Sequence, residues 1–401
     1  MNTMGNEQFG SIDSVSGLTE VERKSILGGP GRPNLEKVVQ GIKGGKYKNI
    51  IVLCGAGISV SAGIPDFRSP KTGLYHNLQK YDLPDPQSIF ELGFFRKNPV
   101  PFFTLAREIY PSLFTPTPTH RFLELLDKKG LLLRVYTQNI DTLERLTGIR
   151  EDKIVECHGS FASNTCQGCH KVYPQSWMKY KLFECPKVSQ DEEGIPYCDD
   201  CGAVVKPDIT FFGEDLPEIF TRRLKPDLKV CDLLFVIGTS LQVFPVAGIV
   251  DQVPKTCPRV LINREMVHTA NCTGQMADDG SLIGALENTA NGVENELVVS
   301  EDGFWWGSET LEAANYRDVF CPGDSDDTIR EICTQLGWAD DLAALVLMDE
   351  GEAVARRSSE ASSTHSVAGE KDLISLMANL TTAQESDGEE QGGGCVSGLG
   401  D

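Results

Sequence analysis

Residues 49–69 read NIIVLCGAGISVSAGIPDFRS and contain the strongest sequence signal for the fold class. It begins with an apolar run, 49–54, which has the length of a buried strand. The turn that follows holds Gly55, Gly57 and Gly63; its first two glycines allow a tight turn and let backbone N–H groups approach a pyrophosphate at the start of the next helix. The spacing differs from the G-x-G-x-x-G of hydride-transferring dehydrogenases, so a merely crowded strand-to-helix turn is the alternative.

Short apolar runs of the same kind recur at 131–136, 153–157, 233–238 and 259–263. Continuous apolar strands are typical of a parallel sheet that is covered on both faces. Helical patterns separate several of them, including a segment that starts near Pro118. We therefore expect an α/β fold with a doubly wound, Rossmann-like parallel sheet.

Composition suggests where domains and tails divide. Residues 1–33 are polar and rich in Gly and Pro, as in a flexible leader, and an amphipathic helix should follow from an N-cap at Asn34. We expect the catalytic domain to comprise 34–160 and 208–347, with a small zinc-binding domain, 161–207, inserted between them. This inserted segment looks poor in strands and too small for a hydrophobic core of its own.

Two further segments look like additions to the core. Residues 266–316 contain nine acidic residues and no Lys or Arg, which predicts an acidic insertion. Residues 348–401 read as a low-complexity acidic tail. Between them, SDDTIREICTQLGW predicts a helix that is capped by Ser325 and ended by Gly337.

The net charge of −21 argues against direct binding to nucleic acid or to an anionic membrane, because both depend on basic groups. A basic protein tail suits this charge better as a partner. The sequence shows no signal peptide and no apolar run long enough to span a membrane. We therefore expect a soluble intracellular protein.

Four of the thirteen cysteines form two CxxC pairs: Cys166, Cys169, Cys198 and Cys201. A loop between the pairs can bring four thiolates around one tetrahedral Zn²⁺. A redox role is the alternative, and Cys185 and His170 are the nearest rival ligands. A site closed by four thiolates leaves no position for water, so the zinc should be structural.

Several blocks resemble the signature motifs of the sirtuin family. They are GAGIS and SAGIPDFRS within 55–69, TGLY at 72–75, YTQNIDTLE at 136–144, ECHGSF at 156–161, KPDITFFGE at 206–214, GTSLQVFP at 238–245 and LINRE at 261–265. The resemblance covers about 35–347 apart from the acidic insertion, and it is closest to the cytoplasmic class I, which includes yeast and human deacetylases.

The resemblance implies an NAD-dependent protein lysine deacetylase whose products are nicotinamide, O-acetyl-ADP-ribose and the free lysine. His158 would be the general base on the NAD ribose, which suits an imidazole at neutral pH, and Asn139 would share the catalytic site. A lone histidine is more often structural, and only the flanking motif makes the catalytic role the stronger hypothesis.

The resemblance also assigns the residues that contact NAD. They are Gly55, Ala56, Gly57, Ile58, Ser59, Val60, Asp66, Phe67, Arg68, Gln138, Asn139, Ile140, Asp141, His158, Gly238, Thr239, Ser240, Asn263, Arg264, Glu265 and Ser325. For Gln138, Asn139 and Asp141 the alternative is a polar loop that caps the next helix.

Acyl-lysine would pass between the domains along Ile209, Thr210, Phe211, Phe212, Gly213 and Glu214. The alternative for these phenylalanines is interdomain core. Family members that prefer acidic acyl chains carry a Tyr and an Arg, three apart, in the pocket wall. The corresponding stretch here, TGLYHNL at 72–78, has no Arg, which predicts acetyl or another uncharged acyl group.

Alternative functions are mono-ADP-ribosyl transfer and a catalytically silent module that senses NAD or interacts through the zinc ribbon. The expected partners are acetylated proteins, either histone tails or cytoplasmic proteins, and the expected location is the cytoplasm with shuttling to the nucleus. An apolar island at 371–380 could be an export signal, an autoinhibitory helix or a poorly ordered amphipathic turn.

Overall fold

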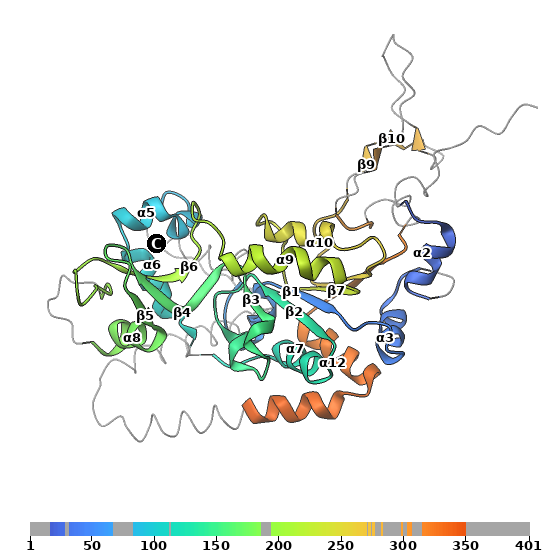
Figure 1. Ribbon diagram of the computed structural model, residues 1–401, viewed down its shortest axis with the longest axis horizontal. Coiled ribbons are helices and arrows are strands. Elements are labelled where there is room, and N and C mark those ends of the chain that lie inside the picture. The colour runs from blue at the N-terminus through green and yellow to red at the C-terminus, as the bar shows by residue number, and fades with distance from the viewer. Residues whose placement is uncertain are drawn as a thin grey trace, which may run out of the picture. The chain divides into compact units, whose positions relative to one another are not determined.

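A six-stranded sheet in the order β13-β8-β7-β1-β2-β3 organises the structure, a computed structural model (Figure 1). The described residues are 17–28, 32–66, 83–111, 114–185, 194–270, 303–306 and 315–349, with short strands between 272 and 299. The strands of the large sheet are β1 Ile50–Cys54, β2 Leu132–Thr137, β3 Ile154–Glu156, β7 Leu233–Ile237, β8 Arg259–Asn263 and β13 Asp318–Pro322. Every neighbouring pair is parallel.

The predicted α/β class and parallel sheet are confirmed. The predicted apolar runs all form strands, with ends that differ by a residue or two, but β13 was not predicted. From β1 the chain builds the sheet in both directions, so neighbouring β1 and β7 form the switch point of a doubly wound fold. A crevice is expected beyond the carboxyl ends of these two strands.

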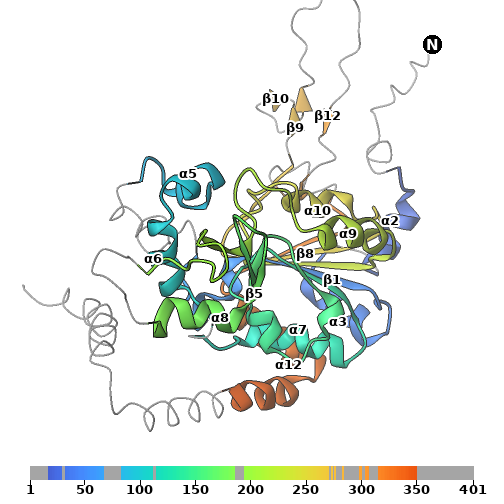
Figure 2. The same ribbon diagram turned by 60° about the vertical axis from the view of Figure 1, so that its left-hand side comes forward.

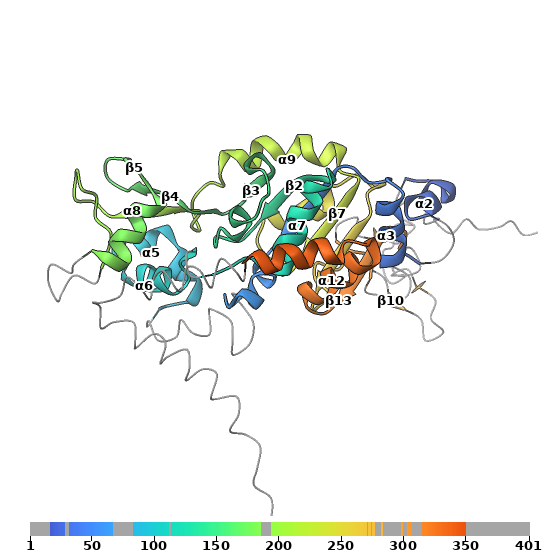
Figure 3. The same cartoon turned by 90° about the horizontal axis from the view of Figure 1, so that it is seen from below.

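Helices cover both faces of the sheet (Figures 1 and 3). On one face lie α3 Leu35–Lys43, α7 Pro118–Lys128 and α12 Ser325–Leu336, and on the other lie α9 Glu218–Val230 and α10 Ile249–Gln252. Alternate side chains of β1 enter the two cores: Ile50 and Val52 pack with the first set, and Ile51 and Leu53 pack with the second. Burial on both faces explains why this strand is apolar throughout.

The helix ends largely follow local capping chemistry. Asn34 accepts a hydrogen bond from the Lys37 N–H at 3.0 Å, which confirms it as the N-cap of α3. Gly337 adopts the left-handed conformation that ends α12, also as predicted. The predicted cap Ser325 is wrong by one position: Asp324 is the N-cap, and Ser325 is the first helical residue.

The inserted segment contains a three-stranded antiparallel sheet in the order β5-β4-β6, so the expectation of a strand-poor segment was wrong (Figure 2). Its elements are β4 Gly159–Cys166, β5 Val172–Pro174, α8 Gln175–Lys179, the π-helix η8 Tyr180–Glu184 and β6 Val205–Ile209. It also shares a hydrophobic core with an earlier segment that contains η4 Pro86–Phe90, α5 Leu92–Lys97 and α6 Val100–Glu108. Because the segment that completes this core lies far away in the sequence, the local pattern of the inserted segment could not predict the shared core.

Two segments that were predicted to lie outside the core contribute to it. Within the expected flexible leader, α2 Glu20–Ile26 is a helix, and Ile26 and Leu27 are buried in the first core. Within the expected acidic insertion, Phe304 and Trp306 stack with ring centroids 4.2 Å apart and are buried in the second core. In both segments, burial of these few apolar side chains stabilises local structure although the neighbouring residues are mostly polar.

The remaining elements are short. They are the 3-10 turns η1 Ala56–Ile58, η2 Val60–Ala62, η6 Leu143–Leu146, η7 Glu151–Lys153 and η9 Val246–Gly248, and the strands β9 Cys272–Thr273, β10 Gln275–Met276, β11 Leu282–Ile283 and β12 Val298–Val299. A last helix covers 339–349. Among the described residues no helix has the length and apolar character needed to cross a membrane.

Candidate functional site

A cavity of about 510 Å³ opens at the carboxyl ends of the parallel strands. Turns after β1, β2, β7, β8 and β13 all contribute to its wall, as expected for a ligand site at the switch point of a doubly wound sheet. The predicted residues that line it are Gly55, Ala56, Gly57, Val60, Asp66, Gln138, Asn139, Ile140, His158, Ile209, Thr210, Phe212, Gly238, Thr239, Ser240, Asn263, Arg264, Glu265 and Ser325.

The glycines after β1 are required by a close approach to the turn after β7. A Cβ atom on Gly55 would lie 2.6 Å from the Thr239 Cβ, and one on Gly57 would lie 2.6 Å from the Gly238 Cα. Close packing of the two turns, the alternative given for these glycines, is therefore present. The turns after β1 and β7 also line the cavity. The helix that was expected to follow this turn is replaced by the short 3-10 turns η1 and η2, and the Gly57 N–H donates to the Gly238 carbonyl at 2.8 Å.

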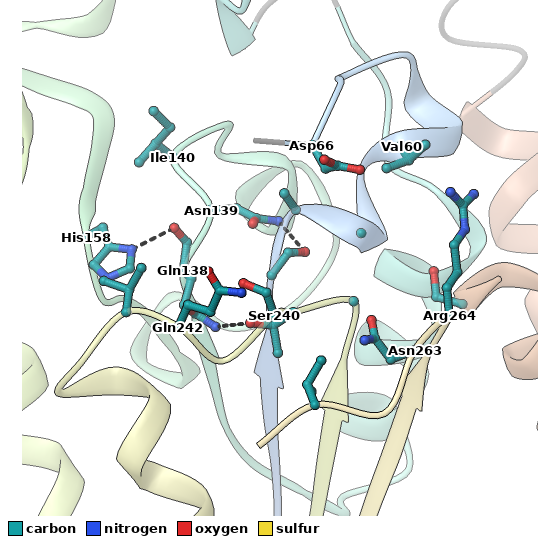
Figure 4. Close-up of a pocket in the computed structure, with 18 of the residues that line it drawn as sticks. Val60, Asp66, Gln138, Asn139, Ile140, His158, Ser240, Gln242, Asn263 and Arg264 are labelled. Carbon is teal, nitrogen blue, oxygen red and sulfur yellow. Dashed lines mark hydrogen bonds between the residues drawn. The ribbon is translucent and has the colours of Figure 1, made fainter. Parts of the chain in front are cut away.

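His158 lies in the turn between β3 and β4 and lines the cavity (Figure 4). Its Nδ1 is 3.0 Å from the Gln138 carbonyl oxygen. A carbonyl can only accept, so Nδ1 must carry the hydrogen, and in the neutral ring Nε2 is left with a free lone pair. Nε2 is covered and has no hydrogen-bond partner among the described residues. Burial lowers the pKa of His158, against the opposing effect of the hydrogen bond to Gln138.

The loop after β2 brings two amide side chains to the turns of neighbouring strands. The Gln138 Nε2 donates to the Thr239 Oγ1 at 2.8 Å. The Asn139 Nδ2 donates to the Gly55 carbonyl at 3.2 Å and to the Ser59 Oγ at 3.3 Å. These bonds tie the turns after β1, β2 and β7 into one wall.

Three predicted contact residues lie behind this wall and do not line the cavity: Ile58, Ser59 and Asp141. The Ser59 hydroxyl donates to the Asp141 carboxylate at 2.7 Å, and the Leu143 N–H donates to its other oxygen at 3.0 Å. Asp141 therefore supports the wall from behind and accepts a hydrogen bond from the first residue of η6, whose N-cap is Thr142.

A buried group of ionisable side chains lies next to Asp141. Candidate ligand atoms of His120, Asp141 and Glu144 lie within 4.8 Å of one another, and all three side chains are buried. Burial, reinforced by the charge of Asp141, raises the pKa of Glu144 to about 8. Burial also raises the pKa of Asp141 and lowers that of His120 to about 3. Glu144 is therefore the carboxyl of this group that holds a proton at neutral pH.

The far end of the cavity contains Asn263, the last residue of β8, and the following Arg264 (Figure 4). The predicted residues Glu265 and Ser325, the latter at the start of α12, also line the cavity. The Arg264 Nε donates to the Asp324 Oδ1 at 2.7 Å. Sequence reasoning did not assign the following lining residues: Phe90, Gln242, Val243, Ile262, Val267, Gly323 and Asp324. Gln242 and Val243 lie within the quoted block 238–245, whereas Gly323 and Asp324 follow the unpredicted strand β13.

Only some of the residues that were predicted to contact acyl-lysine line the cavity. Ile209, Thr210 and Phe212 line the cavity, but Phe211, Gly213 and Glu214 do not. Phe211 packs edge-on against Phe90, with ring centroids 6.1 Å apart, and is buried in the core of the small sheet. Glu214 instead accepts hydrogen bonds from the backbone of Phe211 and from Lys206.

Comparison with known proteins places these features in a family. The Sir2 family model matches residues 55–245. The chain is 45% identical over 314 residues to the NAD-dependent protein deacetylase sirtuin-2 of Danio rerio, a match that covers 78% of this chain and 74% of that protein. The chain belongs to the Sir2 family.

Other Sir2 relatives match with similar coverage. The NAD-dependent protein deacetylase hst2 of Schizosaccharomyces pombe is 40% identical over 313 residues, which are 78% of this chain and 79% of the relative. The NAD-dependent protein deacetylase sirtuin-3 of Mus musculus is 49% identical over 279 residues, which are 70% of this chain and 78% of the relative. The resemblance that the motifs indicated is thereby confirmed.

The four cysteines of this Sir2 protein converge as their spacing predicts. The Cys166 and Cys201 sulfur atoms are 3.4 Å apart, and those of Cys169 and Cys198 are 3.6 Å apart. All four sulfur atoms lie within 4.8 Å of one another, a spacing that fits tetrahedral Zn²⁺ with Zn–S bonds of about 2.3 Å. The rivals Cys185 and His170 are not in this group.

Two further predictions lie outside the described residues. Phe67 and Arg68, expected to orient NAD, follow directly after Asp66, which does line the cavity. The stretch 72–78, on which the acyl preference depends, and the apolar island 371–380 are likewise outside them.

Proposed function

We propose that this protein is an NAD-dependent protein lysine deacetylase. Its Sir2 relatives bear this activity in their names. The observation that carries the proposal is the free Nε2 lone pair of His158, a residue of the cavity wall. It supplies a base in a crevice that has the position and size of a nucleotide site.

His158 acts as the general base. The hydrogen bond from Nδ1–H to the Gln138 carbonyl fixes the tautomer, and burial favours the neutral ring. Nε2 can therefore take a proton from a ribose hydroxyl that is brought within hydrogen-bond reach. Asn139, anchored to the turn after β1, completes the catalytic wall.

When bound in this cavity, NAD would supply the ribose carbon to which the acyl group is transferred, with nicotinamide as the leaving group. The turns after β1 and β7 would hold its phosphates, because both line the cavity at the carboxyl ends of the two strands at the switch point. Asn263, Arg264, Glu265 and Ser325 would hold the adenosine end. We also propose that Phe67 and Arg68 contribute to orienting the nicotinamide end.

Zinc would hold the small sheet together and take no part in the reaction. Four thiolates complete a tetrahedral shell and leave no position for a reactive water. The cluster joins Cys166, at the end of β4, to the loop that precedes β6. Its effect on activity would pass through the position of Ile209 and Thr210 in the cavity wall.

The substrates would be acetylated proteins. Basic histone tails suit the net charge of −21, and cytoplasmic proteins are the other proposed class. We propose a cytoplasmic location with shuttling to the nucleus. The absence of Arg from 72–78 favours an uncharged acyl group, so acetyl-lysine peptides should be turned over faster than succinyl-lysine peptides. Faster desuccinylation would contradict this preference.

The deciding experiment measures nicotinamide release and deacetylation of an acetylated histone peptide, with and without NAD. His158→Ala should lower the rate by roughly a hundredfold or more, because a positioned base contributes about that much. His170→Asn is the matched control: His170 is exposed, has a φ of 60°, and Asn tolerates that conformation.

Labelled NAD separates the alternatives. Label in soluble O-acetyl-ADP-ribose supports deacetylation, whereas label retained on protein supports mono-ADP-ribosyl transfer. An inactive wild-type protein that binds both NAD and zinc would instead indicate a silent NAD-sensing module.

A further inference from the structure

The turn that carries His158 is short and tightly fixed on its downstream side. It joins the end of β3 at Glu156 to the start of β4 at Gly159. Gly159 has a φ of 65°, and a Cβ atom there would lie 1.9 Å from the Asp208 carbonyl oxygen. The Thr210 N–H donates to the His158 carbonyl at 2.8 Å. These contacts fix the backbone, but among the described residues the imidazole itself has only its hydrogen bond to the Gln138 carbonyl.

Side chains on either side of His158 bridge this turn. The Ser160 hydroxyl donates to the Glu156 Oε2 at 2.9 Å. The Ala162 N–H donates in turn to the Ser160 Oγ at 3.2 Å. The Glu156–Ser160 bridge therefore closes a loop whose middle residues are Cys157, His158 and Gly159.

Arg145 connects this bridge to the loop that carries the partner of the imidazole. Its Nε donates to the Glu156 Oε1 at 2.7 Å, and its Nη2 donates to the Oε2 at 2.8 Å. Arg145 belongs to η6, which comes shortly after Gln138 and Asn139. A bidentate guanidinium–carboxylate pair restrains both distance and orientation, which a single contact does not.

The environment of this pair favours a role beyond that of an ordinary surface ion pair. The Glu156 side chain is 12% exposed and that of Arg145 is 35% exposed. Arg145 also contacts Glu151, but that side chain is 84% exposed, so solvent screens this second pair strongly. At the His158 turn the Glu156 carboxylate is thus largely covered although the guanidinium that holds it is exposed, whereas in the second pair both side chains are open to solvent.

We propose that Glu156 is a positioning residue for His158. Held by Arg145 and Ser160, it keeps the His158 turn in register with the Gln138 loop, so that Nδ1 meets the Gln138 carbonyl and Nε2 remains the basic nitrogen. The proposal rests on the proposed function in one respect only, the assignment of His158 as the base. The effect of Glu156 on the orientation and tautomer of the His158 ring can be tested without measuring enzymatic activity.

The first test uses the tautomer of the ring. Two-dimensional ¹H–¹⁵N spectra of the imidazoles distinguish the two neutral tautomers, and the chain has only six histidines to assign. We expect the Nδ1–H form for His158 in the wild-type protein, and a mixture of both forms in Glu156→Ala and Ser160→Ala. Ser160→Thr keeps the hydroxyl that Ser160→Ala removes, so this variant should show the Nδ1–H form of His158 as the wild type does. Glu151→Ala should also show the Nδ1–H form.

The second test uses kinetics on the same variants. Glu156→Ala should lower kcat by roughly tenfold or more, because a small misplacement of a catalytic group is costly, and should leave the KM for NAD within about twofold. Glu151→Ala should match the wild type in both constants.

Each outcome has a distinct meaning. An unchanged His158 tautomer in a folded Glu156→Ala protein would overturn the positioning role. So would a Glu156→Ala protein with a raised KM and an unchanged kcat, or a Glu151→Ala protein whose kcat falls as much as that of Glu156→Ala. A shifted tautomer in a protein without NAD-dependent deacetylation would support the positioning role and contradict the proposed function.

Discussion

At the scale of single residues, the properties of His158 follow from its immediate surroundings. Its place after β3 brings the ring to the cavity, and the Gln138 carbonyl selects which nitrogen carries the hydrogen. Covering the ring disfavours the charged form, and this effect exceeds that of the hydrogen bond, which favours it. A base whose pKa is lowered stays neutral over a wider range of pH.

The pH profile of kcat/KM tests this balance. With His158 as the proposed base, the neutral ring is the active form, so the acidic decline of the rate should be centred below pH 6.5, the ordinary pKa of histidine. Circular dichroism at each pH would check that the protein remains folded. His170→Asn should give the same profile, and an acidic decline centred above pH 6.5 would contradict the prediction.

At the scale of elements, the small sheet depends on two distant contributions. Helices of 86–108 supply apolar side chains to its core, and four cysteines close one end of it. β5 has three residues and β6 has five, so backbone pairing alone gives this sheet little stability. The metal should therefore contribute a large share of it.

Removal of one ligand tests that share. Cys201→Ser should abolish stoichiometric zinc binding and lower the free energy of unfolding by at least about 2 kcal/mol, because metal binding is coupled to folding. Zinc content by elemental analysis and urea denaturation would measure both effects. Cys185→Ser is the matched control and should keep the zinc, since this residue lies outside the cluster; loss of zinc in the control would contradict the assignment.

At the scale of the whole molecule, a buried acid makes stability depend on pH. The pKa of Glu144 rises from its ordinary 4.5 to about 8 in the folded state, because burial and the charge of Asp141 disfavour ionisation. Between these two values the folded chain holds a proton that the unfolded chain has released. The contribution of this group to stability is therefore present below about pH 4.5, falls as pH rises, and levels off above about pH 8.

Glu144→Gln tests this dependence because the amide has nearly the same shape but cannot ionise. The stability of the variant relative to the wild type should increase steadily from pH 5 to pH 8, as measured by urea denaturation. Glu151→Gln changes an exposed carboxylate and serves as the control. If the difference in free energy of unfolding between Glu144→Gln and the wild type is the same at every pH from 5 to 8, Glu144 does not hold a proton in the folded state over this range.

The fold was largely predictable because its main signals are local. Apolar runs such as 259–263 identify buried strands without knowledge of their partners, and the two CxxC pairs identify the zinc ligands from spacing alone. β13 was not predicted because Asp318 and Pro322 stand at its two ends and leave an apolar run of only three residues, 319–321. Asp318 can be buried only because Arg259, on the neighbouring strand, pairs with it at 2.6 Å.

The fold class, the zinc ligands and the residues that gather at the carboxyl edge of the sheet could thus be predicted before the structure was known. Which of these residues face the cavity could be seen only in the folded protein: Asn139 lies in the cavity wall, whereas Asp141 lies behind it, and Phe212 lines the cavity while Phe211 is buried in the core. The physical reason is that hydrophobic periodicity and ligand spacing are properties of a short segment, whereas the direction of a loop side chain depends on contacts with residues far away in the chain.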